Sequence, residues 1–127
     1  KNVEFLGALE DRELVRLMQR CAAAIFPSRD DFGLIPIEVA ACGRPTLAFR
    51  AGGALETLVP GVTGEFFDRQ DTSSLRAALR AFDPDAYDPR AIREHALGWS
   101  AERFQGRLEA VVRELATPPR ELALHGR

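Results

Sequence analysis

Two carboxylates and a glycine within one short segment are the residues of this chain best suited to chemistry. The segment Ser28–Pro45 reads SRDDFGLIPIEVAACGRP, and seven residues separate Asp30 from Glu38 within it. Gly33 lies between them, where a loop should turn into a helix, and the apolar run AAAIF comes just before. A helix that begins here presents unpaired backbone N–H groups and a partial positive charge. Such a site suits a ligand that carries both sugar hydroxyls and phosphate.

The elements that must position these residues alternate along the chain between strand-like and helix-like patterns. Apolar, β-prone runs predict strands over residues 3–6, 22–26, 46–49 and 65–67. Helical spacing of apolar residues and helix-boundary signals predict helices near residues 12–21, 34–42, 54–58, 72–82, 90–97 and 101–116. Asp11, Asp71 and Ser100 are the expected N-caps, and residues 83–89 are an expected loop. This order predicts an α/β fold, with a parallel sheet of about four strands and helices on both faces.

The ligand is expected at the carboxyl ends of the parallel strands. Two loops leave such ends, Pro27–Phe32 and Arg50–Gly53, and both should lie on the same edge of the sheet. Gly33, directly after the first loop, and Gly52 and Gly53 in the second let the backbone come close to a ligand. The backbone N–H groups of Leu34 and Ile35 would then meet a diphosphate, and Glu38, one turn further along, would accept hydrogen bonds from a ribose.

Composition excludes several other classes of protein. The chain has 127 residues, 46% hydrophobic and 28% charged, with a net charge of −2, which is typical of one soluble globular domain. No basic stripe indicates nucleic acid as a partner, and no apolar run is long enough to cross a bilayer. Neither cysteine has a second ligand at zinc-binding spacing, so we expect Cys21 and Cys42 to be free, buried thiols.

The run DDFGLIPIEVAACGRPTLAFRAGGALETLVPGVTGEFF resembles the nucleotide-sugar half of retaining glycosyltransferases of the GT-B fold, most of all family 4 (glycosyl transferases group 1). The acid-seven-Glu signature corresponds to Asp30 and Glu38, and the FGL segment to residues 32–34. The GG turn corresponds to Gly52 and Gly53, and the following TG to residues 63–64. The resemblance covers about residues 3–115, with these motifs in the same order and spacing.

The resemblance implies a role for each matching position. Glu38 would hold the ribose hydroxyls of the donor, and the N–H groups near Leu34 and Ile35 would hold its diphosphate. Asp30, with Asp31 and the backbone of Phe32 and Gly33, would bind hydroxyls of the transferred hexose, beside the Gly52–Gly53 turn. The transfer to an acceptor hydroxyl would retain the anomeric configuration and would need no cofactor and no bound metal.

The chain also departs from the family pattern. The first acid of the signature is usually Glu, and Asp30 is about 1.5 Å shorter in reach. A complete enzyme has two Rossmann-like domains, so we expect residues 1–116 to be part of the C-terminal, donor-binding domain and residues 117–127 to be a tail. The partners would be a nucleotide-sugar donor, the missing N-terminal domain and, through exposed interdomain surface, a second copy. We expect the chain alone to be inactive, and its location to be cytoplasmic or peripheral at the inner face of a membrane.

Two alternatives stay open at this stage. One is an epimerase of the same fold that acts on nucleotide sugars, and the other is a non-catalytic Rossmann-like binding module. A phosphorylase is disfavoured, because a pyridoxal-binding lysine is needed and Lys1 is the only lysine. Arg50 could face the diphosphate or the solvent.

Overall fold

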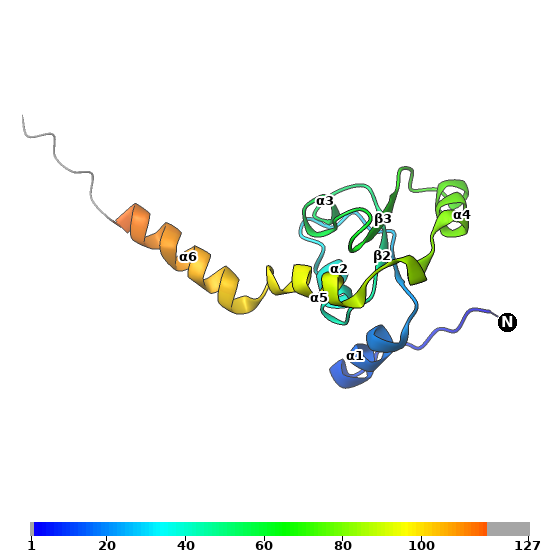
Figure 1. Cartoon of the computed structure of the whole chain (residues 1–127), viewed down its shortest axis with the longest axis horizontal. Coiled ribbons are helices and arrows are strands. Elements are labelled where there is room, and N and C mark those ends of the chain that lie inside the picture. The colour runs from blue at the N-terminus through cyan, green and yellow to red at the C-terminus, as the bar shows by residue number, and fades with distance from the viewer. Residues whose placement is uncertain (1, 117–127) are drawn as a thin grey trace, which may run out of the picture.

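A computed structural model describes residues 2–116 of the chain, and these form an α/β fold (Figure 1). The strands are β1 (Ala24–Phe26), β2 (Thr46–Phe49) and β3 (Gly64–Phe67), all parallel, in the order β1-β2-β3. The helices are α1 (Asp11–Arg20), α2 (Leu34–Ala41), α3 (Ala54–Thr57), α4 (Thr72–Ala81), α5 (Pro89–Leu97) and α6 (Ala101–Ala116), with a 3-10 turn, η1, over Pro84–Ala86. Most predicted bounds hold to within one or two residues. The division between a domain over residues 1–116 and a tail over 117–127 lies partly outside the described residues.

Helices lie on both sides of the sheet, as predicted. Figure 1 shows α2, α3 and α5 to one side of the strands and α4 to the other. On one face, Phe26 and Ala48 pack against Ala54 and Leu58 of α3 and its C-cap, with Phe66 alongside. A second apolar cluster joins α2 to α5. Burying these side chains supplies the main stabilisation of the fold.

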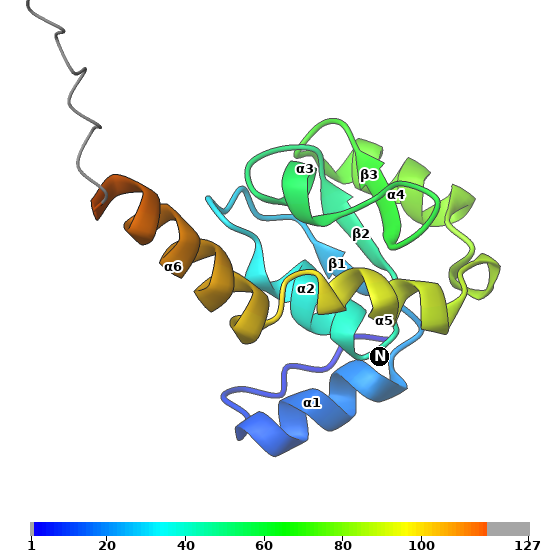
Figure 2. The ribbon, with the colours of Figure 1, turned by 60° about the vertical axis from the view of Figure 1, so that its left-hand side comes forward.

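The predicted strand over residues 3–6 is wrong. These residues form no strand, the side chain of Phe5 is 95% exposed, and the sheet within residues 2–116 has three strands rather than four. An apolar run becomes a strand only when the backbone groups of a neighbouring strand pair with it. No strand lies beside residues 3–6, because β1 pairs with β2 alone and the N-terminal segment runs beside α1 (Figure 2).

Helix caps agree with the sequence in two of three cases. The carboxylate of Asp71 accepts a hydrogen bond from the Ser74 N–H at 2.7 Å, and the Ser100 hydroxyl accepts one from the Arg103 N–H at 3.3 Å. The expected cap by Asp11 is wrong. Glu10 is the N-cap of α1, and its own N–H donates to the Glu13 carboxylate three residues further on, at 3.2 Å. The Glu13 carboxylate thus satisfies the backbone N–H of the N-cap Glu10. Asp11 is the first residue of the helix and not its cap.

The last helix, α6, does not pack along the sheet. Helix α6 has no buried residue and extends away from the strands in both views (Figures 1 and 2). Its amphipathic pattern is real, but no other described segment covers its apolar side. The exposed apolar face of α6 consists of Phe104, Leu108, Val111, Val112 and Leu115.

Candidate functional site

The loop between β1 and α2 enters the helix through a single left-handed residue. Gly33, the N-cap of α2, has φ +74° and ψ 56°, which glycine adopts without the steric penalty of a side chain. Gly33 is also buried, and a Cβ there would lie 3.2 Å from the backbone nitrogen of Ala54. This glycine therefore both starts α2 and lets the loop lie directly against α3.

The two loops that leave the carboxyl ends of β1 and β2 meet, as the parallel order predicts. The Gly53 N–H donates to the Asp30 carbonyl oxygen at 2.8 Å. A Cβ on Gly52 would overlap the Asp30 carbonyl, and one on Gly53 would overlap the carbonyl group of Phe32. Only glycines allow this approach, so the Gly52–Gly53 turn fixes the backbone course of residues 30–32.

Helix α2 begins beside this junction with unpaired donors. The N–H groups of Leu34 and Ile35 belong to the first turn, where a helix offers no internal acceptor, and Pro36 carries no N–H at all. The side chains of Leu34 and Ile35 are 58% and 44% exposed, so this end of the helix is open. The helix start therefore combines free N–H groups with the positive end of the helix dipole, which favours an anion.

The two acids of the signature lie in different surroundings. Asp30 and its neighbour Asp31 are exposed in the loop that packs on Gly52. Glu38 is exposed as well, but it lines a cleft of about 410 Å³ between α1 and α2. The α1 side of that cleft is largely apolar, and its lining there is Asp11, Leu14, Val15, Met18 and Gln19.

The side chain of Arg50, in the loop after β2, contacts Asp68 and Phe66. Its guanidinium pairs with the carboxylate of Asp68 and lies over the ring of Phe66, 4.7 Å from the ring centre. The side chains of Arg50 and Asp68 are 48% and 73% exposed, so the ion pair contributes little to stability, although it holds the guanidinium of Arg50 in place. In this arrangement Arg50 faces Asp68 and Phe66.

Three residues that sequence reasoning left without a role border the site. The ring of Trp99 lies edge-on to that of Phe32, with 6.0 Å between the ring centres and 82° between the ring planes. His95 Nε2 lies 2.8 Å from the carbonyl oxygen of Thr57, the last residue of α3. The Thr57 hydroxyl donates to the Gly53 carbonyl at 3.1 Å. No spacing in the sequence could reveal the contacts of Trp99 and His95, because these residues are far along the chain from Phe32 and Thr57.

The cysteines do not form a site of their own. Both thiols are free and half-buried, and the Cys21 thiol donates to the Met18 carbonyl at 3.1 Å. Burial raises the pKa of both thiols, which keeps them protonated near neutral pH.

Within residues 2–116, no three acidic, histidine or cysteine side chains gather as metal ligands. In the same part of the chain, no helix has the length and apolar character that crossing a bilayer requires.

The three-stranded parallel sheet with helices on both sides defines an α/β domain of the GT-B type, and comparison with known proteins identifies the family. Residues 1–98 match the family described as glycosyl transferases group 1, and the chain belongs to this family. It is 39% identical over 90 residues to the glycogen synthase of Mycobacterium tuberculosis, an alignment that covers 68% of this chain and 22% of that protein. It is 32% identical over 124 residues to the D-inositol 3-phosphate glycosyltransferase of Corynebacterium urealyticum, covering 94% of this chain and 29% of the relative.

Solved structures show the same fold. The sucrose-phosphate synthase of Thermosynechococcus elongatus superposes with a TM-score of 0.78 at 27% identity, covering 88% of this chain and 30% of that one. Anabaena Alr3699/HepE, solved in complex with UDP and glucose, has a TM-score of 0.57 at 22% identity and is similar in fold alone. The chain spans less than a third of the length of these relatives and structures.

Proposed function

We propose that this chain is the donor-binding part of a retaining glycosyltransferase, which transfers a hexosyl group from a nucleoside-diphosphate sugar to an acceptor hydroxyl. The observation that carries this proposal is the open start of α2. Free N–H groups at Leu34 and Ile35 lie there beside the acidic loop that carries Asp30 and Asp31. Glu38 lines a cleft one turn further along the same helix. Membership of the glycosyl transferases group 1 family supports the same conclusion.

A nucleotide sugar matches this arrangement part by part. The diphosphate meets the N–H groups of Leu34 and Ile35, where the helix dipole favours negative charge. The ribose hydroxyls donate to the carboxylate of Glu38, and the nucleobase lies against the apolar α1 side of the cleft. Hydroxyls of the transferred hexose donate to Asp30, assisted by Asp31.

The chemistry follows from fixed donors and from alignment. As the bond between the anomeric carbon and the diphosphate breaks, negative charge grows on the departing oxygen. In this proposal the N–H groups at the start of α2 lie beside that oxygen, so they stabilise the charge without reorganising. We propose that this stabilisation takes the place of a metal ion, and that the acceptor oxygen bonds to the anomeric carbon on the face that the leaving group vacates while its hydroxyl proton passes to the departing diphosphate oxygen. Proton NMR of the first product of the complete enzyme would identify the anomer, and an inverted anomer would contradict retention.

We propose that this reaction needs more than the 127-residue chain. Its relatives are more than three times longer, and we propose that a preceding Rossmann-like domain holds the acceptor. We therefore expect no transferase activity from the 127-residue chain, and turnover of UDP-glucose with a sugar acceptor would contradict this. The apolar face of α6 is exposed, and we propose that it meets the preceding domain in the complete enzyme and a second copy when the chain is alone. A cytoplasmic location, free or at the inner face of a membrane, belongs to the same proposal.

Calorimetric titration of the chain with UDP, GDP and ADP tests donor binding directly. One of the three should bind, and Glu38→Gln should weaken that binding roughly 10- to 100-fold, because a charged acceptor of two hydrogen bonds is lost. Glu94→Gln, an exposed glutamate on α5, makes the same chemical change away from the cleft and should bind as the unaltered chain does. Equal affinity in all three proteins would refute the assigned role of Glu38. Absence of binding by every nucleotide at millimolar concentration, checked by saturation-transfer NMR, would refute the proposed function.

A further inference from the structure

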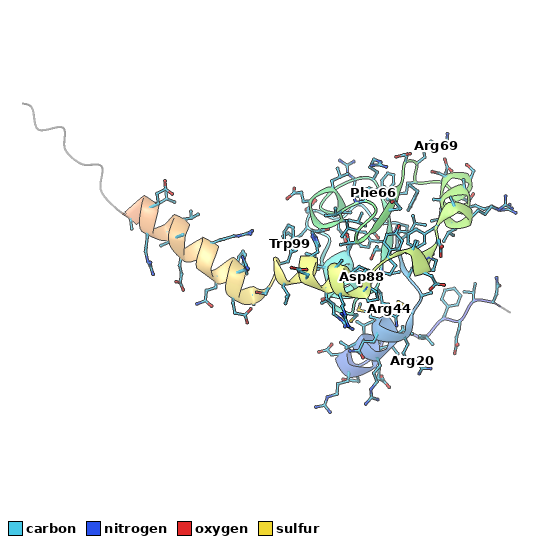
Figure 3. All side chains as sticks on the ribbon, in the orientation of Figure 1. Arg20, Arg44, Phe66, Arg69, Asp88 and Trp99 are labelled. Atoms are coloured by element: carbon cyan, nitrogen blue, oxygen red, sulfur yellow. The ribbon has the colours of Figure 1, made fainter. Side chains whose placement is uncertain are left out.

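The edge-on contact between Phe32 and Trp99 joins the donor loop, the segment Pro27–Phe32 that carries Asp30 and Asp31, to a distant part of the chain. Phe32 directly precedes Gly33, the N-cap of α2, and its side chain is 52% exposed. Trp99 directly follows Gly98, the C-cap of α5, and stands at the junction between α5 and α6 (Figure 3). The rings meet in the edge-to-face geometry that aromatic pairs prefer.

Trp99 follows directly on helix α5, and this helix packs against α2 and contacts the end of α3. The backbone N–H of Trp99 donates to the Ala96 carbonyl at 2.9 Å, which continues the last turn of α5. Ile92 and Ala96 of that helix are buried against Ala40 of α2. His95 adds the contact to the Thr57 carbonyl at the end of α3. Helix α5 therefore touches both helices that flank the donor loop and holds the backbone of Trp99 at its end.

The loop residue Phe32 is held on its backbone side by different contacts. Gly53 lies directly against its carbonyl group, so the loop backbone has no room to move toward the Gly52–Gly53 turn. Nothing in that contact restrains the ring of Phe32, which is half exposed. Trp99 supplies the restraint on the ring. Movement of Phe32 away from Trp99 would carry along Asp31 on one side and Gly33, with the first N–H groups of α2, on the other.

We propose that Trp99 is a positioning residue for the donor, acting through Phe32 to hold the loop in which hexose hydroxyls and diphosphate are bound. This inference rests on the proposed function. It extends the donor site to the α5–α6 junction, and it makes donor binding sensitive to the position of α6. In the proposed function the donor loop contacts the hexose. Substitution of Trp99 should therefore weaken binding of the complete nucleotide sugar more than binding of the free nucleotide.

Trp99 is the only tryptophan in the chain, which gives a direct optical test. The chain is titrated with UDP, GDP and ADP, and with UDP-glucose, GDP-mannose and ADP-glucose, by calorimetry and by tryptophan fluorescence in parallel. Fluorescence of Trp99 should change on binding, with the same dissociation constant as the heat signal. Calorimetric binding with unchanged fluorescence would overturn the positioning role and leave the proposed function standing. Absence of calorimetric binding by all six ligands would overturn both.

Substitutions separate positioning from simple packing. Trp99→Leu should weaken binding of the nucleotide sugar roughly 2- to 10-fold, the range expected for a lost aromatic pair, with a smaller effect on the free nucleotide. Trp99→Phe keeps an aromatic edge and should restore most of the affinity. Phe104→Leu makes a matched aromatic-to-leucine change on the exposed face of α6 and should leave affinity unchanged.

A double-mutant cycle with Phe32→Leu should be non-additive, because both substitutions remove the same contact. Thermal unfolding is recorded for every variant. A purely structural Trp99 would lower the melting temperature while leaving the ratio of nucleotide-sugar to nucleotide affinity unchanged. That pattern, or additivity in the cycle, would overturn the proposal.

Discussion

The substitution Gly53→Ala tests the junction on which the whole site depends. The backbone of Gly53 has φ −63°, which alanine adopts without strain, so any effect comes from the added methyl group alone. That methyl group would overlap the carbonyl carbon and oxygen of Phe32. Because these are backbone atoms, a rotamer change cannot relieve the overlap, and the loop over residues 30–32 must move away from the turn.

The magnitude follows from two contributions. Overpacking against a fixed neighbour costs about 1–3 kcal/mol. Displacing the loop also weakens the hydrogen bond from Gly53 to Asp30, whose net worth is about 0.5–1.5 kcal/mol. We expect a loss of about 2–4 kcal/mol in the free energy of unfolding, which is roughly 6–20 °C in Tm for a chain of this size. Binding of the preferred nucleotide should fall with it, because the start of α2 moves with Phe32.

The assay pairs urea unfolding with calorimetric titration, and Gly61→Ala is the control. Gly61 has φ +73° with open space around its Cβ position, so alanine there costs only the left-handed conformation, about 1–2 kcal/mol. Gly61→Ala should therefore lose stability while binding the nucleotide normally. If Gly53→Ala unfolds and binds as the unaltered chain does, the packing of the Gly52–Gly53 turn on the acidic loop is not as described and the reasoning fails.

Three further predictions concern other parts of the chain. Hydrogen bonds from the Ser73 hydroxyl, the Ser74 N–H and a neighbouring arginine hold the pKa of Asp71 at about 2, so its capping contribution is present above about pH 4 and is lost as the pH falls toward 2. Urea midpoints of Asp71→Ala and the unaltered chain should accordingly differ at pH 6 and converge near pH 2, and a constant gap would contradict this. Gly106→Ala places a methyl group in open space inside α6 and should stabilise that helix by about 0.5–1 kcal/mol, seen as slower amide exchange there, whereas unchanged exchange would argue against a helix at this position. Leu108→Glu interrupts the exposed apolar face of α6 and should shift sedimentation of the chain toward the monomer, and a chain that is already monomeric would refute self-association.

Local signals in the sequence predicted the elements that carry the site. Gly33 before an apolar run predicted the start of α2, because glycine acts through its own backbone geometry. The run TLAF predicted β2 with the observed bounds, and Asp71 predicted the cap of α4. The joining of the two loops also followed from the sequence, because successive parallel strands bring their carboxyl ends to one edge.

Sequence patterns did not predict the structure correctly where it depended on contact with another segment of the chain. The run at residues 3–6 has the composition of a strand, yet no strand lies beside it to pair with. Helix α6 has an amphipathic pattern, yet the described part of the chain leaves its apolar face uncovered. A pattern shows which side of an element is apolar, but it does not show which surface, if any, will cover that side.

The sequence by itself determined where the chain turns, where α2 begins and which acids flank that start, because these depend on backbone conformation within a few residues. Only the tertiary structure decided that Glu38 shares a cleft with α1, that Gly53 supports the carbonyl of Phe32, and that Trp99 meets its ring. The physical reason is that contacts between distant segments are set by how whole helices pack. A shift of one helix by a single turn would bring different side chains together without altering any local signal.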